Sequence, residues 1–241
     1  MRSLGSSPSP PERFTPADLG LALLALASGS SDAVAFLTFG SVFTSAMTGN
    51  TALLGIAISR GRLSDAFLGL LALTGFVVGA ATAAAVSEYR GDIGLARGLR
   101  PLFALEAGYL ACFALLWTTA RHPPEGSAVF ALIVLSAAAM GIQSVAARRI
   151  NAPGINTIVF TTTLVTIIIS ITGAVVRRAR PLVGFATLRQ IGIFFTYAIG
   201  VIIAGVLTRH ELIWVAFVPL VSVVGAFACC EVDARWQNHK L

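Results

Sequence analysis

Long apolar runs separated by short joints of charged, Gly and Pro residues dominate this chain of 241 residues. A helix needs about 20 apolar residues to cross about 30 Å of hydrocarbon. Eight stretches approach that length: 19–39, 42–59, 66–87, 101–120, 127–147, 157–176, 190–208 and 212–230. The pattern therefore predicts an all-α integral membrane protein, a polytopic helical bundle of eight apolar segments.

The composition favours lipid over water as the solvent of these helices. Hydrophobic residues make up 56% of the chain and charged residues 12%, with a mean hydropathy of +0.84. Soluble domains carry about 25% charged residues, so this chain has too few to cover a water-facing surface. We expect a single transmembrane domain over 19–230, a disordered Ser- and Pro-rich tail over 1–18, and a short cytoplasmic tail over 231–241.

Two topologies fit this series of segments. In the first, all eight segments cross the membrane. In the second, 42–59 and 157–176 enter the membrane and return to the same face, which leaves six spans and two re-entrant or half-helix elements. We prefer eight spans because 157–176 is long enough to cross outright. Both arrangements put most of the Lys and Arg residues, and both termini, on the cytoplasmic side.

The net charge of +6 does not indicate nucleic-acid binding in a membrane chain. Basic joints orient the helices and meet anionic lipid, so the bilayer is the expected partner. The three histidines lie in joints or the tail without metal-ligand spacing, and the three cysteines fit the role of small apolar residues. We therefore expect no enzymatic activity, no catalytic residue, no metal and no cofactor.

The two halves of the chain, 19–120 and 127–230, are weakly alike. The motif at 76–79 resembles that at 197–200, and the motif at 29–32 resembles that at 141–144. Either an internal duplication or shared membrane composition would produce this likeness, and internal repeats are common in transporters. Four spans per repeat would make the repeats parallel, whereas three spans and a re-entrant element would make them inverted.

Polar residues interrupt the apolar runs of the first half at two places. Asp32 lies inside the first segment, where a charged side chain costs about 2.5–3.5 kcal/mol and needs a partner, water or the protein interior. Thr48, Gly49 and Asn50 open the second segment with a hydroxyl, a small residue and an amide. Both places fit a substrate or proton site near the midplane, and both also fit structural hydrogen bonds or close helix packing.

The second half carries a corresponding polar set. Gln143 is its most informative member because an amide has several hydrogen-bonding positions to satisfy. Ser144 and Thr162 are weaker signals, since hydroxyls in membrane helices often bond to their own backbone. Glu106, close to Arg100 at the start of the fourth segment, is interpreted as interfacial and paired with that arginine.

The sequence resembles the YoaK family of bacterial multi-pass membrane proteins over roughly 19–230. The resemblance lies in Ser31-Asp32-Ala33, Phe36, Gly40, Val42-Phe43, Met47-Thr48-Gly49-Asn50-Thr51 and Gly141-Ile142-Gln143-Ser144. Ser144 stands where that family usually has Asn, and the run Thr161–Thr163 lacks a Gly that the family often shows there. The resemblance implies a bacterial inner-membrane protein, described as a small-molecule transporter and often given six spans.

Two classes of function follow from these observations. The first is a transporter that binds an unidentified small solute between two pseudo-repeats, with Asp32 as proton carrier. It predicts a water-accessible cavity shared by Asp32, Asn50 and Gln143. The second is a non-transporting scaffold or partner subunit, which predicts a well-packed bundle without a central cavity. A homo-oligomer is compatible with both.

Overall fold

The computed structural model describes residues 14–90, 95–150, 160–178, 181, 183–210 and 213–238, and every regular element in these ranges is helical. The elements are α1 (Pro16–Thr38), α2 (Met47–Ser59), α3 (Leu63–Arg90), α4 (Leu95–Thr119), α5 (Ser127–Ile150), α6 (Phe160–Val176), α7 (Phe185–Arg209), the short 3₁₀ helix η1 (Ile213–Ala216) and α8 (Phe217–Asn238). The prediction of an all-α membrane protein with eight apolar helical segments is confirmed.

Six of these helices are long and apolar enough to cross a membrane, and two are shorter. The 13 residues of α2 span about 20 Å and the 17 residues of α6 about 25 Å, against a hydrocarbon thickness of about 30 Å. Within the described residues, six long helices and two short ones therefore replace the eight full spans that we preferred. The physical reason at α2 is a turn with positive φ at Gly40 and Ser41, which delays the helix to Met47.

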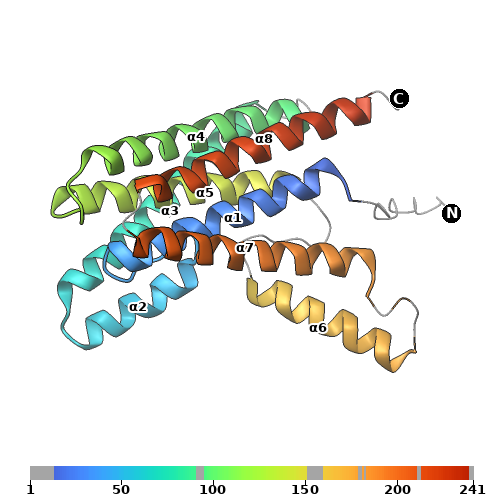
Figure 1. The fold of residues 1–241 in the computed structure, drawn as a ribbon, viewed down its shortest axis with the longest axis horizontal. Helices are drawn as coiled ribbons and strands as arrows, with labels where there is room; N and C mark the ends of the chain where they lie inside the picture. The colour runs from blue at the N-terminus through green and yellow to red at the C-terminus, as the bar shows by residue number, and fades with distance from the viewer. Residues whose placement is uncertain are drawn as a thin grey trace.

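The two short helices lie on the same side of the bundle but at opposite ends of it (Figure 1). From the middle of the molecule, α2 runs toward the end where α3 begins, and α6 runs toward the end where α7 begins. The long helices run along one common axis, and α1 begins at the same end at which α8 finishes (Figure 1). A chain whose first and last long helices start and finish at the same end of the bundle crosses the membrane an even number of times.

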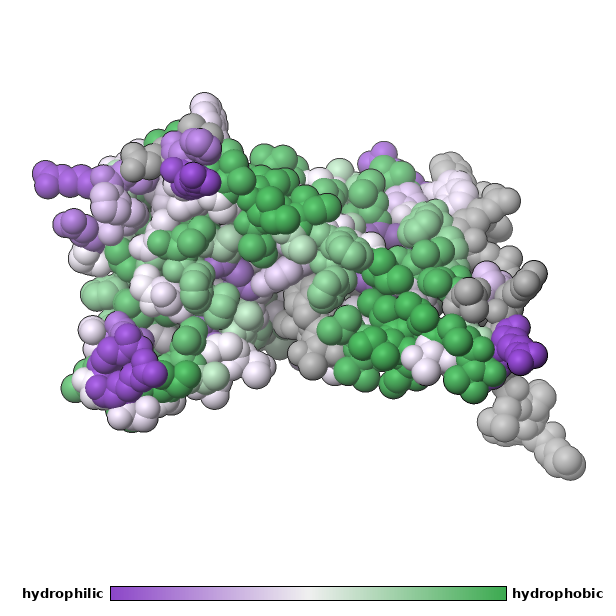
Figure 2. All heavy atoms as spheres, turned by 60° about the horizontal axis from the view of Figure 1, so that its bottom comes forward, coloured by the Kyte–Doolittle hydropathy of each residue, from purple (hydrophilic) through white to green (hydrophobic). Residues whose placement is uncertain are grey.

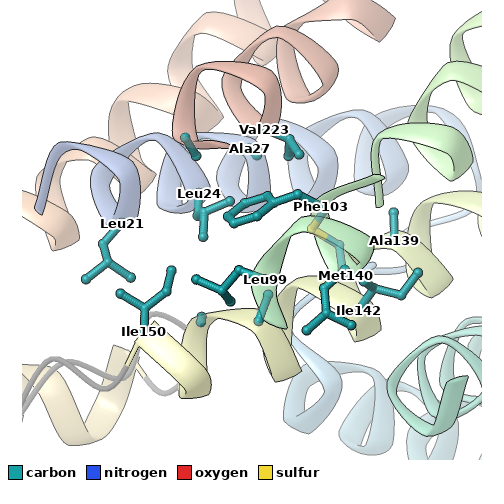
Figure 3. Close-up of a cluster of buried hydrophobic side chains, with 14 of the residues drawn as sticks. Leu21, Leu24, Ala27, Leu99, Phe103, Ala139, Met140, Ile142, Ile150 and Val223 are labelled. Atoms are coloured by element: carbon teal, nitrogen blue, oxygen red, sulfur yellow. The ribbon is translucent and has the colours of Figure 1, made fainter. Parts of the chain in front are cut away.

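Helices α1 and α5 form the centre of the bundle. Their membrane-spanning windows are 72% and 61% buried, against 17% for α7. A central helix needs small side chains on several faces, which the Ala, Gly and Ser residues of α1 and α5 supply. Figure 3 shows the resulting core, in which Leu24 of α1, Phe103 of α4, Met140 of α5 and Val223 of α8 meet.

The remaining helices surround this centre in two matching sets. Helix α1 packs mainly against α7 and α8, and α5 packs mainly against α3 and α4. The short helices also match, because α2 lies on α3 and α6 lies on α7. Contacts between α4 and α8, and between α1 and α5, join the sets. Exchanging α1–α4 for α5–α8 therefore reproduces the pattern of contacts.

Glycines bring α1 and α7 into backbone contact. A Cβ atom added to Gly29 would come closer than 3.0 Å to the carbonyl oxygen of Tyr197, and one added to Gly200 would do the same at Leu26. These positions admit no larger residue unless the helices separate. The two helix backbones thus approach as closely as glycine permits.

Backbone contacts at glycines also join α3 and α5. A Cβ atom added to Gly79 would meet the carbonyl of Ala138, and one added to Gly141 would meet the carbonyl of Phe76, again closer than 3.0 Å. The two contact residues of α1 lie 112 positions before the corresponding contact residues of α5. The two contact residues of α3 lie 121 positions before the corresponding contact residues of α7. The two interfaces therefore use equivalent residues of the two halves.

The helices extend beyond the limits predicted from hydropathy. Helix α1 begins at Pro16, inside the expected N-terminal tail, because Thr15 and Asp18 form a capping box around it. Helix α8 continues to Asn238, inside the expected C-terminal tail. There Glu231 accepts two hydrogen bonds of 2.7 Å from Arg100 of α4, which fix the last turns of α8 to the bundle. Residues 1–13 lie outside the described residues.

The surface agrees with immersion in lipid. Figure 2 shows apolar side chains across the middle of the visible face and polar ones gathered toward its two ends. Large apolar side chains remain exposed along the outer helices, such as Ile169 on α6, Ile202 on α7 and Val221 on α8. Lipid accepts such groups, whereas a soluble monomer would not expose so many together.

We expect Gly141→Ala to lower the unfolding temperature of the purified protein in detergent. The added methyl group must displace the Phe76 carbonyl, and overpacking of this kind costs about 1–3 kcal/mol. Gly205→Ala is the matched control, because nothing lies within 4 Å of its added Cβ atom and alanine is the better helix former. Equal unfolding temperatures for the two variants would contradict the close approach of α3 and α5.

Candidate functional site

The segment between α1 and α2, residues 39–46, is the clearest break in the membrane helices. It is non-helical although Phe39, Val42, Thr44 and Ser45 are buried. Backbone N–H and C=O groups without helical partners are costly in such surroundings, so side chains must satisfy them. Two of the polar residues predicted from the sequence, Asp32 and Asn50, do this.

Asp32 holds the second part of the segment. Its Oδ1 atom accepts hydrogen bonds from the backbone N–H of Thr44 at 2.8 Å, from that of Ser45 at 2.7 Å, and from the Thr44 hydroxyl at 3.3 Å. Its Oδ2 atom accepts a bond of 2.6 Å from the Ser45 hydroxyl. Asp32 is 2% exposed, so these bonds replace water around the carboxylate.

A third helix reaches the same carboxylate. The hydroxyl of Tyr197 on α7 donates a hydrogen bond of 2.9 Å to Oδ2 of Asp32. Because the Tyr197 backbone also meets Gly29, the bond forms at the closest approach of α1 and α7. The carboxylate therefore ties together α1, the segment 39–46 and α7. Sequence reasoning missed Tyr197, since a tyrosine within an apolar run is also common as packing.

Asn50 holds the first part of the segment. Its Oδ1 atom accepts from the backbone N–H of Phe43 at 2.8 Å, and its Nδ2 donates to the Phe43 carbonyl at 2.6 Å. One amide side chain thus satisfies both polar groups of one residue. Gly49 lies under the Phe43 ring, where an added Cβ atom would come within 3.0 Å, and Thr48 is exposed. Asp32 and Asn50 are therefore brought together around one segment.

The second-half residues lie elsewhere. Nε2 of Gln143 donates to the carbonyl of Leu24 at 3.0 Å and to the Ser28 hydroxyl at 2.7 Å, which joins α5 to α1. The Ser144 hydroxyl bonds to the carbonyl of Met140 in its own helix, and Thr162 is exposed near the start of α6. Thr161 and Asn156, also noted in the sequence, lie outside the residues whose side chains are described.

Asp32 is enclosed, which differs from the expected water-accessible carboxylate. Its five hydrogen bonds come from Thr44, Ser45 and Tyr197, and none of them needs a solute. Two cavities lie away from it. One of about 940 Å³ is lined by apolar residues of α3 and α4, and one of about 290 Å³ lies between the first turns of α1 and α7. The structure assigns Asp32 the role of anchoring the segment 39–46.

The two halves differ at this anchor. At the spacing of the glycine contacts, Asp32 of α1 corresponds to Ser144 of α5, and Tyr197 of α7 corresponds to Phe76 of α3. A serine and a phenylalanine cannot form the bond between a carboxylate and a phenol. The link between α1 and α7 therefore has no chemical counterpart between α5 and α3.

One buried ion pair was missed by sequence reasoning, and one buried carboxyl group was misplaced by it. Arg189 of α7 forms an ion pair with Asp18 in the first turn of α1, and both side chains are 6% exposed. No local pattern indicated this pair, because Asp18 was assigned to the tail. Glu106 was expected at the interface beside Arg100, but it is fully buried, and Arg100 instead pairs with Glu231.

These features define a polytopic helical membrane protein in which a broken, buried segment is secured by a carboxylate and an amide. The chain belongs to the family described as "Protein of unknown function (DUF1275)", which matches residues 20–229. It is 32% identical over 220 residues to the "UPF0700 transmembrane protein YoaK" of Bacillus subtilis (strain 168), covering 90% of this chain and 96% of that protein. No solved structure matches the chain. The resemblance to the YoaK family is thus confirmed.

We expect Asp32→Ala to lower the unfolding temperature more than Tyr197→Phe. Removing the carboxylate leaves several buried donors unpaired, each costing about 1–3 kcal/mol, whereas Tyr197→Phe removes one donor from a carboxylate that keeps the others. Thermal unfolding of the purified variants in detergent measures both effects.

Two controls match these changes in chemistry. Asp65→Ala removes a carboxylate from an exposed ion pair with Arg62, and Tyr109→Phe removes a phenol hydroxyl from the edge of the core. Both should leave the unfolding temperature nearly unchanged. An Asp32→Ala protein as stable as Asp65→Ala would show that Asp32 does not anchor the segment.

Proposed function

We propose that the protein is a small-solute transporter of the bacterial inner membrane, built from two inverted units with both termini in the cytoplasm. The first unit comprises α1–α4 and the second α5–α8. Each contains three long helices and one short helix, and an odd number of crossings reverses the orientation of the second unit in the membrane. Inverted units of this kind are characteristic of transporters that alternate between two faces.

The matching interfaces carry this proposal. Backbone contacts of α1 with α7 recur between α5 and α3 at constant sequence spacings, and the short helices run from the middle of the molecule toward opposite ends (Figure 1). Shared composition alone would not place equivalent residues in equivalent contacts. An internal duplication accounts for both the spacings and the order of packing.

The polar site of the proposed transporter lies where the short helices begin, near the middle of the bundle. Thr48 and Gly49 open α2, with Asn50 beneath them, and Thr162 stands in the first turn of α6. Gln143 and Ser144 lie on the central helix α5. Asp32 acts indirectly, by fixing the segment that leads into α2. Breaking the Tyr197 bond to Asp32 would free α7 to move away from that segment.

A scaffold or partner subunit is the second candidate, and the enclosed Asp32 favours it. In that case the bonds of Asp32 and Gln143 only stabilise a permanently packed bundle, and the starts of α2 and α6 never become exposed to both sides of the membrane. The two functions therefore differ in the accessibility of Thr48 and Thr162.

Single cysteines at these two positions test the proposal. In a background with Cys112, Cys229 and Cys230 replaced by Ala, we expect Thr48→Cys and Thr162→Cys each to react with a membrane-impermeant maleimide in both right-side-out and inside-out vesicles. Alternating exposure of the central site requires reaction from both sides. A scaffold predicts reaction from one side only, or from neither.

Tyr89→Cys is the control for vesicle orientation. Tyr89 is 94% exposed at the end of α3, so a cysteine there should react in one vesicle orientation only. Adding Tyr197→Phe should increase the two-sided reaction of Thr48→Cys, because it weakens the bond that holds α7 to the segment 39–46. Strictly one-sided reaction of both cysteines would refute the transporter.

A further inference from the structure

Glu106 lies in the middle of α4, within the span Arg97–Thr119, and is 0% exposed. The residues one turn away on the same face, Leu102 and Leu110, are also fully buried. They belong to the core between α1, α4, α5 and α8, part of which is drawn in Figure 3. Glu106 therefore points into the centre of the bundle, where the two proposed units meet.

The Glu106 carboxyl group has no partner there. Neither of its oxygens has a hydrogen-bond partner among the described residues. Arg100, the nearest cation on the same helix, is held by two hydrogen bonds to Glu231. An ionised carboxylate without partners is very costly in apolar surroundings, so the group is a neutral acid in this conformation.

The register of α4 and α8 keeps other charges away from this position. Arg100 meets Glu231 and Phe103 packs on Phe227, so Glu106 lies at the level of the apolar stretch 223–226. The ionisable groups of the helices packed on α4 lie nearer the ends of those helices. Among the residues whose side chains are described, they are Asp65, Glu88 and Tyr89 on α3, Arg148 and Arg149 on α5, and Cys229, Cys230, Glu231, Asp233 and Arg235 on α8. On α4 itself the others are Arg97, Arg100, Tyr109 and Cys112.

Asp32 provides the contrast. Both carboxyl groups are buried, but Asp32 is surrounded by donors that stabilise its ionised form, whereas no described residue donates to Glu106. Loss of a proton from Glu106 requires water or a cation to reach it, and hence a separation of α4 from α5 or α8. Protonation of Glu106 and opening of the bundle core are therefore linked, because the ionised form is stable only in the open arrangement.

We propose that Glu106 is a proton-binding site, which holds its proton in the closed bundle and exchanges it with water when the core opens. This deepens the proposed function, because only a transporter could couple that exchange to movement of a solute. The exchange itself rests on the burial and isolation of Glu106 alone. It also transfers the role of proton carrier from Asp32, the residue that the sequence favoured.

Dicyclohexylcarbodiimide is a suitable probe, because it partitions into membranes and reacts with protonated carboxyl groups. The full chain in lipid vesicles is treated at acidic and at alkaline pH, and modified peptides are located by mass spectrometry. We expect Glu106 to be modified at acidic pH. At alkaline pH this modification should be lost, because Glu106 gives up its proton to water when the core opens and the reagent needs a protonated carboxyl group. Asp32, whose two oxygens are already occupied by hydrogen bonds from Thr44, Ser45 and Tyr197, should be modified less than Glu106 at acidic pH.

Glu106→Gln is the control variant, since it preserves the shape of the side chain and removes the acid. It should lose modification in the α4 peptide and retain an unfolding temperature close to that of the wild type, because the carboxyl group makes no bond to lose. Absence of modification at Glu106 at every pH, or modification that does not change with pH, would overturn the proposal. Both results are independent of the reactivity of Thr48→Cys and Thr162→Cys, so the proposed function can fail separately.

Discussion

Every polar group of the backbone inside a bilayer must find its partner within the protein, and the segment 39–46 is where this chain meets that requirement without a helix. Asp32 and Asn50 replace the missing helical bonds, one for residues 44 and 45 and the other for residue 43. The short helix α2 can begin in the middle of the bundle only because these two side chains satisfy the segment before it. The Tyr197 hydroxyl then makes the position of α7 depend on the same carboxylate.

Close backbone packing is the second determinant of the architecture. Four glycines set the distances between α1 and α7 and between α3 and α5, and so attach α7 and α3 to the two central helices. Such contacts specify position strictly, because a single added methyl group must move a backbone. Helices held in this way shift as units, whereas the outer helix α6, which packs chiefly on α7, is less constrained.

Much of the fold could be predicted from the sequence, because hydropathy and breaks in hydropathy are local signals. The eight apolar segments, the polar breaks at Asp32 and Asn50, and the likeness of 76–79 to 197–200 were all evident in this way. The number of full spans was not, since a turn at Gly40 and Ser41 determines where α2 begins. Partners distant in the chain were also hidden. Arg100 pairs with Glu231, 131 positions away, and Glu106 of the same helix has no hydrogen-bond partner among the described residues.

The difference between the Asp32–Tyr197 link and its counterpart, Ser144 and Phe76, has a mechanical consequence. A hydrogen bond is directional and breaks abruptly when its atoms part, while van der Waals packing yields by degrees. At its centre the interface of α1 with α7 therefore depends on a bond that breaks at once, whereas α5 and α3 meet at the equivalent position by packing and are bonded only nearer their ends, from Arg149 to the Ser87 carbonyl among the described residues. Two interfaces that are packed alike therefore differ in stiffness at their centres, and α7 should part from α1 in one step once the Tyr197 bond is broken.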